Sequence, residues 1–164
     1  MERAYLPAST SGLGTTFTLY FPALPVEAKA AVKPKQIALI PQGSETILLA
    51  EDEEPVRKVL ARTLEKYGYK VLEAPNGVEA MKLASAHKGP IDLLLTDTIM
   101  PQMNGKELAD ELVKSYPKVK ILFVSGYTRE VLSQKGILGP DINLIQKPFD
   151  LEDLARELRR ILEA

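Results

Sequence analysis

The chain has 164 residues, with 21 basic and 22 acidic side chains and a formal net charge of −1. This balance excludes a bulk electrostatic attraction to nucleic acid or to an anionic membrane. There is no cysteine, which excludes disulfides and thiolate chemistry, and no apolar stretch approaches the roughly 20 residues that span a bilayer. We therefore expect a cytoplasmic protein that contacts neither nucleic acid nor membrane.

Residues 1–44 differ in pattern from the rest of the chain. Thr15 to Phe21 alternates polar and apolar residues, which is typical of a half-exposed strand. A stretch rich in proline and alanine follows and indicates an extended linker. We expect this segment to be the last strand of another domain plus a tether.

From Thr46 onward, short apolar runs alternate with longer amphipathic ones. The runs predict five strands at Ile47–Ala50, Lys70–Glu73, Ile91–Thr96, Lys120–Ser125 and Ile142–Gln146. Apolar residues at helical spacing predict five helices, at Val56–Tyr67, Asn76–Ala86, Leu108–Tyr116, Thr128–Lys135 (stopped by Gly136) and Leu151–Leu162. Strict alternation of this kind predicts an α/β fold with a doubly wound parallel sheet, covered by helices on both faces.

Charged and hydroxyl residues follow these strands. Glu51-Asp52 follow the first strand, Asp97 the third and Lys147 the fifth, while Ser125 closes the fourth. Ligands of open parallel sheets bind at the carboxyl ends of the strands, near the point where strand order reverses. We therefore expect three acids and one lysine to meet in one crevice.

Such a crevice suits a divalent cation and a phosphoryl group. Mg²⁺ prefers carboxylate and phosphate oxygens, so Asp52 and Asp97 are candidate ligands, with Glu51 as an outer or water-mediated one. A carboxylate can also attack phosphorus to give an aspartyl phosphate. Lys147 could then pair with one phosphoryl oxygen, and Ser125 could donate its hydroxyl to another.

Each of these residues alone has a common structural explanation. An acid after a strand is often a helix cap, a Lys-Pro pair is often a turn with a solvated lysine, and the run Glu51–Glu54 suits the start of a helix. The single histidine, His87, is expected at a solvated helix end, which argues against a histidine-based triad or metal cluster. The combination at four strand ends, in this order, favours the site.

Four motifs resemble the receiver domain of two-component response regulators. They are Ile47–Glu53, Asp97–Pro101 with Asn104-Gly105, Ser125–Tyr127 and Lys147–Phe149, and the resemblance covers roughly residues 45–164. It implies a flavodoxin-like (CheY-like) fold with five helices and strand order 2-1-3-4-5.

The resemblance also implies roles for individual residues. Asp97 would be the phosphoacceptor, Asp52 with Glu51 the acidic pair that holds Mg²⁺, and the backbone carbonyl of Ile99 a further metal ligand. Ser125 would be the switch hydroxyl and Lys147 the contact to the phosphoryl group. These roles agree with those that the chemistry of the residues suggested.

One position departs from the family pattern. The switch residue three positions before the lysine is often aromatic, and here it is Leu144. A leucine makes a smaller rearrangement than an aromatic ring, which weakens the expected coupling between phosphorylation and conformation. Tyr127 could replace some of that packing or could serve the helix start.

The segment Gly12–Pro22 resembles the last glycine box and final strand of a histidine-kinase ATP-binding domain. This resemblance implies the C-terminal receiver of a hybrid histidine kinase, with a domain remnant and linker at 1–44 and the receiver at 45–164. The parts that would bind adenine and magnesium are absent from this sequence, so we expect neither ATP binding nor kinase activity from it.

The leading hypothesis is a phosphorelay acceptor. Asp97 would take a phosphoryl group from a histidine kinase or a histidine phosphotransfer protein, with Mg²⁺ as cofactor, and lose it by hydrolysis or onward transfer. The output would pass through the face of the fourth helix, fifth strand and fifth helix, which could also form a homodimer. No DNA-binding domain follows the last expected helix, so we expect the output to go through another protein or an attached kinase.

Two alternatives stay open. One is a docking module that uses the receiver fold without phosphorylation, which Leu144 leaves open. The other is a small metal-dependent phosphatase of similar topology, which lacks its second acid because Ile99 occupies that position.

Overall fold

The computed structural model describes residues 5–10, 12, 14–20, 42–134, 139 and 142–164. The chain divides into two compact units, residues 1–36 and 37–164. In the first unit, β1 (Tyr5–Thr10) and β2 (Gly14–Leu19) pair antiparallel as a two-stranded sheet. The predicted strand is therefore confirmed as β2 with shifted bounds, but it belongs to a hairpin rather than standing alone.

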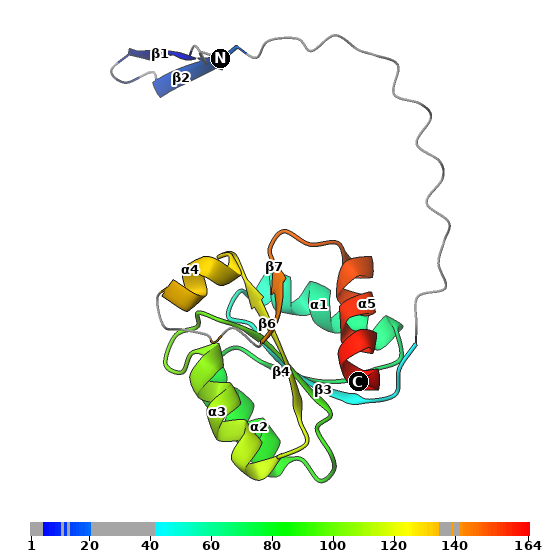
Figure 1. Cartoon of the computed structure of the whole chain (residues 1–164). Coiled ribbons are helices and arrows are strands. Elements are labelled where there is room, and N and C mark those ends of the chain that lie inside the picture. The colour runs from blue at the N-terminus through cyan, green and yellow to red at the C-terminus, as the bar shows by residue number, and fades with distance from the viewer. Residues whose placement is uncertain (1–4, 11, 13, 21–41, 135–138, 140–141) are drawn as a thin grey trace, which may run out of the picture. The chain divides into compact units, whose positions relative to one another are not determined.

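The second unit alternates strands and helices throughout. Its elements are β3 (Thr46–Ala50), α1 (Glu54–Lys66), β4 (Lys70–Ala74), α2 (Gly77–Ala86), β5 (Leu93–Asp97), α3 (Gly105–Ser115), β6 (Lys120–Ser125), α4 (Arg129–Gln134), β7 (Asn143–Gln146) and α5 (Leu151–Glu163). The strands form one parallel sheet in the order β4-β3-β5-β6-β7. Counted from β3, this is the predicted order 2-1-3-4-5. Figure 1 shows α2 and α3 on one side of this sheet and α1 and α5 on the other.

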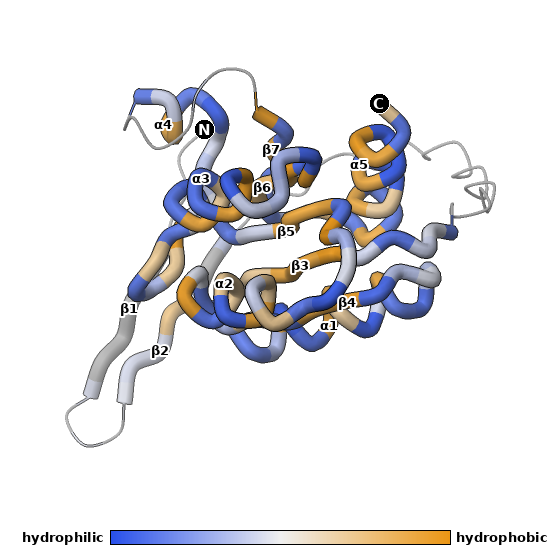
Figure 2. Tube along the Cα trace, turned by 90° about the horizontal axis from the view of Figure 1, so that it is seen from below, coloured by the Kyte–Doolittle hydropathy of each residue, from blue (hydrophilic) through white to orange (hydrophobic). Residues whose placement is uncertain are grey.

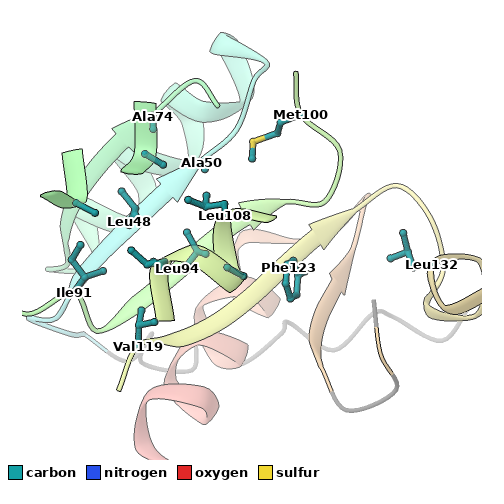
Figure 3. Close-up of a cluster of buried hydrophobic side chains, with 14 residues drawn as sticks. Leu48, Ala50, Ala74, Ile91, Leu94, Met100, Leu108, Val119, Phe123 and Leu132 are labelled. Atoms are coloured by element: carbon teal, nitrogen blue, oxygen red, sulfur yellow. The ribbon is translucent and has the colours of Figure 1, made fainter. Parts of the chain in front are cut away.

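Alternate residues of the central strands face opposite layers of helices. In β3, Ile47 and Leu49 belong to the apolar cluster that also holds the buried leucines of α1 and α5. Leu48 and Ala50 belong to a second cluster with α2 and α3, where Figure 3 shows Leu48 beside Leu94 and Leu108. Figure 2 shows the result as apolar strands β3, β5 and β6 between helices with hydrophilic outer faces. Burial on both faces is what the continuous apolar runs predicted.

Side-chain caps fix where two helices begin. The Asn76 side chain accepts a hydrogen bond from the Glu79 N–H at the start of α2. Asn104 and Glu107 form a reciprocal capping box at the start of α3. Because both caps lie in loops that leave the carboxyl ends of strands, they order the edge of the sheet that carries the predicted site.

Several predicted ends move by one or two residues. The third predicted strand begins at Leu93 rather than Ile91, and its end extends to include Asp97. The predicted helix from Thr128 is confirmed over Arg129–Gln134, whereas its expected stop at Gly136 and the linker at 21–41 lie outside the described residues. Among the described helices, none is long and apolar enough to cross a membrane.

Candidate functional site: an acidic crevice with one lysine

Three carboxylates and one ammonium group meet at the carboxyl ends of β3, β5 and β7. One carboxylate oxygen from each of Glu51, Asp52 and Asp97 lies within 4.8 Å of the others. The Lys147 Nζ lies 2.9 Å from Glu51 Oε2 and 2.8 Å from Asp97 Oδ2. The structure therefore brings together the four charged residues that the sequence pattern predicted to meet.

Glu51 is the buried member of the acidic group. Its side chain is only 1% exposed, and burial raises its pKa although hydrogen bonding to Lys147 acts in the opposite direction. Its second oxygen, Oε1, is buried with no hydrogen-bond partner among the described residues. An orphaned carboxylate oxygen beside two further carboxylates fits a hard cation such as Mg²⁺, which takes oxygen ligands.

Lys147 keeps its charge in this setting. Burial acts to lower its pKa, but hydrogen bonds and charge attraction from Asp97 and Glu51 outweigh burial and raise it. The residue follows β7, and its backbone N–H donates to the Ser125 carbonyl at 2.7 Å. The Lys147-Pro148 peptide bond is cis. The hydrogen bonds to Glu51 and Asp97 hold the ammonium group between the two carboxylates.

Asp97 combines hydrogen bonding with access from outside. Its Oδ1 accepts the Ile99 N–H at 2.9 Å, while Oδ2 receives Lys147, and the side chain is 14% exposed. Ile99, whose carbonyl is the predicted further ligand, thus lies in a turn that folds back on the carboxylate. This carboxylate is oriented by two donors and open enough to meet a reactant.

Asp52 is exposed, and the loop that carries it is held by Arg57. The guanidinium Nη1 of Arg57 donates to the carbonyl of Glu51 at 2.7 Å and lies 3.4 Å from that of Asp52. Sequence reasoning did not single out Arg57, because an arginine in the first turns of an amphipathic helix resembles any solvated residue. Its contacts fix the backbone from which both acids project.

Ser125 is fully buried beneath the crevice. Its Oγ accepts the Tyr127 N–H at 3.0 Å and lies 3.0 Å from the Thr98 hydroxyl, which is also buried. Thr98 Oγ1 lies 3.5 Å from Asp97 Oδ1, at the limit of hydrogen bonding. Thr98 was missed from the sequence, since a threonine after an acid carries no signal of its own.

Gly105 permits the close approach of α3 to the phosphoacceptor candidate. A Cβ at this position would lie 2.1 Å from the carbonyl oxygen of Asp97. In the sequence, Gly105 stood in the Asn104-Gly105 pair of a motif that resembles the receiver family, but nothing there assigned it a role of its own. The glycine is needed because backbone packs directly on backbone here.

Leu144, at the expected switch position, packs against the core. It is partly buried against the cluster between the sheet and the helices α2 and α3, and it pairs in register with Phe123. The side chain of Tyr127 is 44% exposed and thus does not fill the core in its place.

An apolar groove is lined by residues that follow Asp52 and Lys147 in the chain. It runs between the start of α1 and the segment after Lys147, and its lining residues are Pro55, Val56, Val59, Leu60, Phe149 and Leu151. Val59, which lines this groove, is 55% exposed.

Residues 47–159 match the family model described as the response regulator receiver domain. The fold and the crevice at its carboxyl edge agree with that match. The chain belongs to the response regulator receiver family, and its function is that of a receiver in two-component signalling.

Curated relatives include one sensor kinase and one short receiver. The chain is 38% identical over 162 residues to the sensor kinase CckA of Brucella abortus, a match that covers 94% of this chain but only 17% of that protein. It is 39% identical over 118 residues to the response regulator receiver protein CpdR of the same organism, covering 72% of this chain and 97% of that protein.

Solved structures agree with the fold. The receiver domain of the hybrid histidine kinase CckA is 36% identical with a TM-score of 0.55, covering 71% of this chain and 98% of that domain. The response regulator TrrA of Thermotoga maritima, solved in complex with Mg²⁺-BeF, is 30% identical with a TM-score of 0.59, covering 71% of this chain and 98% of that chain.

Proposed function

We propose that the chain is a phosphoacceptor and that Asp97 takes a phosphoryl group from a phosphohistidine. A bond forms between an Asp97 carboxylate oxygen and phosphorus as the phosphorus–nitrogen bond breaks, and the electron pair of that bond returns to the imidazole. The observation that carries this proposal is the ammonium group of Lys147 at 2.8 Å from the Asp97 carboxylate.

The chain's own residues would each do one part of the work. Ile99 N–H and Lys147 orient the nucleophilic carboxylate. As the phosphoryl group arrives, Lys147 pairs with one of its oxygens and Ser125 donates to another. Neither step requires proton abstraction, because Asp97 reacts as a carboxylate.

Mg²⁺ is the proposed cofactor. Glu51, Asp52 and Asp97 would hold it with the Ile99 carbonyl, and it would neutralise charge on the transferring phosphoryl oxygens. Glu51 Oε1, which has no hydrogen-bond partner in the part of the chain that the structure describes, supports this assignment, and so does the Mg²⁺-BeF complex of the similar regulator TrrA.

The proposed partner is a histidine kinase or a histidine phosphotransfer protein. The apolar groove at Val59 and Phe149 supports docking of a partner next to the nucleophile, since its lining reaches within a few residues of both Asp52 and Lys147. The receiver of a hybrid kinase would meet such a partner in its own chain or in another. A homodimer through α4, β7 and α5 is a second proposed contact.

We also propose that residues 1–44 are the end of a kinase ATP-binding domain followed by a linker. Two observations support this: the match to the sensor kinase CckA covers 94% of the chain, and β1 and β2 form a sheet of only two strands. The parent protein would then be a hybrid histidine kinase that acts in the cytoplasm.

The test is incubation with acetyl phosphate and Mg²⁺, followed by intact mass measurement. One added phosphoryl group, absent in Asp97→Asn and absent when the metal is chelated, is expected. No adduct under any donor and metal condition would contradict the proposal. It would favour the second candidate, a docking module without phosphorylation, which the core packing of Leu144 leaves open.

A further inference from the structure

The hydroxyl of Thr98 lies between the candidate nucleophile and the switch serine. Thr98 is 1% exposed, and its Oγ1 is 3.0 Å from Ser125 Oγ and 3.5 Å from Asp97 Oδ1. These three side chains thus form a short chain of polar atoms under the crevice. Neither the phosphoryl transfer nor the cation site uses Thr98.

The protons of the two hydroxyls can point in two directions along this chain. A hydroxyl has one proton to donate and two lone pairs that accept. In one direction, Ser125 donates to Thr98 and Thr98 donates to Asp97. In the other, Thr98 donates to Ser125, and the Ser125 proton is free for another acceptor.

The charge on Asp97 selects between these directions. A carboxylate is a strong, charged acceptor, so the unphosphorylated residue favours donation from Thr98 and hence from Ser125 to Thr98. In an acyl phosphate, the aspartyl oxygens lose that charge and the phosphoryl oxygens carry it. The Ser125 proton is then better placed on a phosphoryl oxygen than on Thr98.

In the unphosphorylated protein, Thr98 is therefore the acceptor of the Ser125 hydroxyl proton. In the phosphorylated protein, a phosphoryl oxygen takes its place as acceptor. Among the described residues, the other hydrogen-bond partner of Ser125 Oγ is the Tyr127 N–H, which donates and cannot accept the proton. A buried hydroxyl proton without an acceptor is costly. Thr98 relieves that cost in the unphosphorylated protein alone.

We propose that Thr98 is a positioning residue that holds the Ser125 hydroxyl in its unphosphorylated arrangement and releases it when Asp97 is phosphorylated. This rests on the proposed phosphoacceptor function. The contact between the Thr98 and Ser125 hydroxyls, called the latch below, would couple the charge on Asp97 to the switch serine. In this chain the switch position that is often aromatic in the family carries Leu144.

The first test measures the latch without phosphorylation. Free energies of unfolding are compared for Thr98→Val, Ser125→Ala and the double variant in metal-free buffer. Non-additive losses are expected, since each single variant breaks the same contact. Additive losses would overturn the proposal.

The second test measures release, using beryllium fluoride with Mg²⁺ as a phosphoryl mimic. Thr98→Val should bind the mimic about three- to tenfold more tightly than the wild type, because the variant destabilises the unliganded arrangement selectively. Thr98→Ser should restore wild-type affinity, and Thr98→Val should have no such effect in the Ser125→Ala background. A purely structural threonine would leave affinity unchanged or weaken it in both backgrounds.

The outcomes separate the two proposals. If the wild type binds the mimic and Thr98→Val does not bind it more tightly, the latch is wrong and the phosphoacceptor function stands. If the wild type does not bind the mimic and forms no adduct with acetyl phosphate, the phosphoacceptor function is wrong, and the coupling of Thr98 to phosphorylation fails with it. Thr63→Val, which removes a hydroxyl that bonds the Val59 carbonyl within α1, is the matched control and should leave the affinity unchanged.

Discussion

Lys147 bridges Glu51 and Asp97, with its Nζ within 2.9 Å of one oxygen of each. In the proposed transfer, the ammonium group would stand where positive charge is needed for the phosphoryl group, and without that group it neutralises part of the acidic cluster. It also competes with any metal cation for the same carboxylates. Removing the ammonium group should therefore affect phosphoryl transfer and metal binding in opposite directions.

Replacing Lys147 by alanine should slow adduct formation from acetyl phosphate by about 100-fold, the scale seen when one preorganised charge partner is removed. The same variant should bind Mg²⁺ several-fold more tightly, because the cation no longer competes with the ammonium group. Titration calorimetry checks the second effect. Lys88→Ala, in the loop at the opposite edge of the sheet, is the control and should change neither quantity; weaker Mg²⁺ binding in Lys147→Ala would refute the competition.

Glu51→Gln should stabilise the metal-free protein at neutral pH. Burial raises the pKa of Glu51 above its unfolded value, so its contribution to stability is fully present below the unfolded pKa and is lost as pH rises through the folded pKa. At pH 7 the buried carboxylate is therefore a net cost, and the neutral amide should raise the free energy of unfolding by roughly 1 kcal/mol.

Denaturant unfolding as a function of pH checks the effect of Glu51→Gln. The gain should shrink as pH falls from the raised pKa of Glu51 towards the ordinary pKa of a glutamate, and below that value it should change no further. Saturating Mg²⁺ should reduce or reverse the gain, because the cation stabilises the carboxylate. Glu65→Gln, exposed on α1, is the control. If Glu51→Gln is less stable than the wild type at pH 7 without metal, the ionised carboxylate of Glu51 stabilises the fold, and the prediction is wrong.

Gly105→Ala should destabilise the fold by about 1–3 kcal/mol, the usual range for forced overpacking. The added methyl group would lie 2.1 Å from the Asp97 carbonyl oxygen, so either α3 or the strand end must shift. Gly126→Ala is a matched control, because a Cβ there meets nothing within 4 Å. Thermal unfolding compares the two, and equal stability would mean that α3 does not approach the strand end this closely.

Deleting residues 1–36 should leave the thermal stability of the receiver unchanged, because these residues form the first of the two compact units. Deleting residues 1–45 should lower it by roughly 1–2 kcal/mol, since this removes the Gly43 N–H to Tyr67 hydrogen bond and the Glu45–Arg159 ion pair at 2.8 Å. Unfolding of the two truncated proteins checks the difference. A large loss already with the shorter deletion would mean that the first unit supports the receiver.

The sequence predicted the parts of the fold that depend on apolar periodicity. Runs such as Leu93–Leu95 could only be buried on both faces, and that requirement led to the parallel sheet and to the edge where Asp97 and Lys147 meet. It did not predict β1, in which Pro7 interrupts a weak pattern. Pairing with β2 is an interaction between two segments, and neither segment's own periodicity reports it.

The charged residues of the site and Ser125 were predicted from their places at strand ends, whereas Thr98 and Gly105 were missed. The sequence shows charged residues at the ends of predicted strands, namely Asp52, Asp97 and Lys147. Thr98 and Gly105 matter only because β5, β6 and α3 bring other atoms within contact distance of them. The sequence alone does not show which atoms come into contact in this way.

The most direct test of the account is chemical identification of the phosphorylated residue. An acyl phosphate is reduced by borohydride to an alcohol, which converts a modified aspartate into homoserine. After incubation with acetyl phosphate and Mg²⁺, reduction and peptide mass analysis should find homoserine at position 97 and at no other aspartate. Homoserine at Asp52 or elsewhere, or none at all while the intact protein carries a phosphoryl group, would contradict the assignment of Asp97 as the phosphoacceptor.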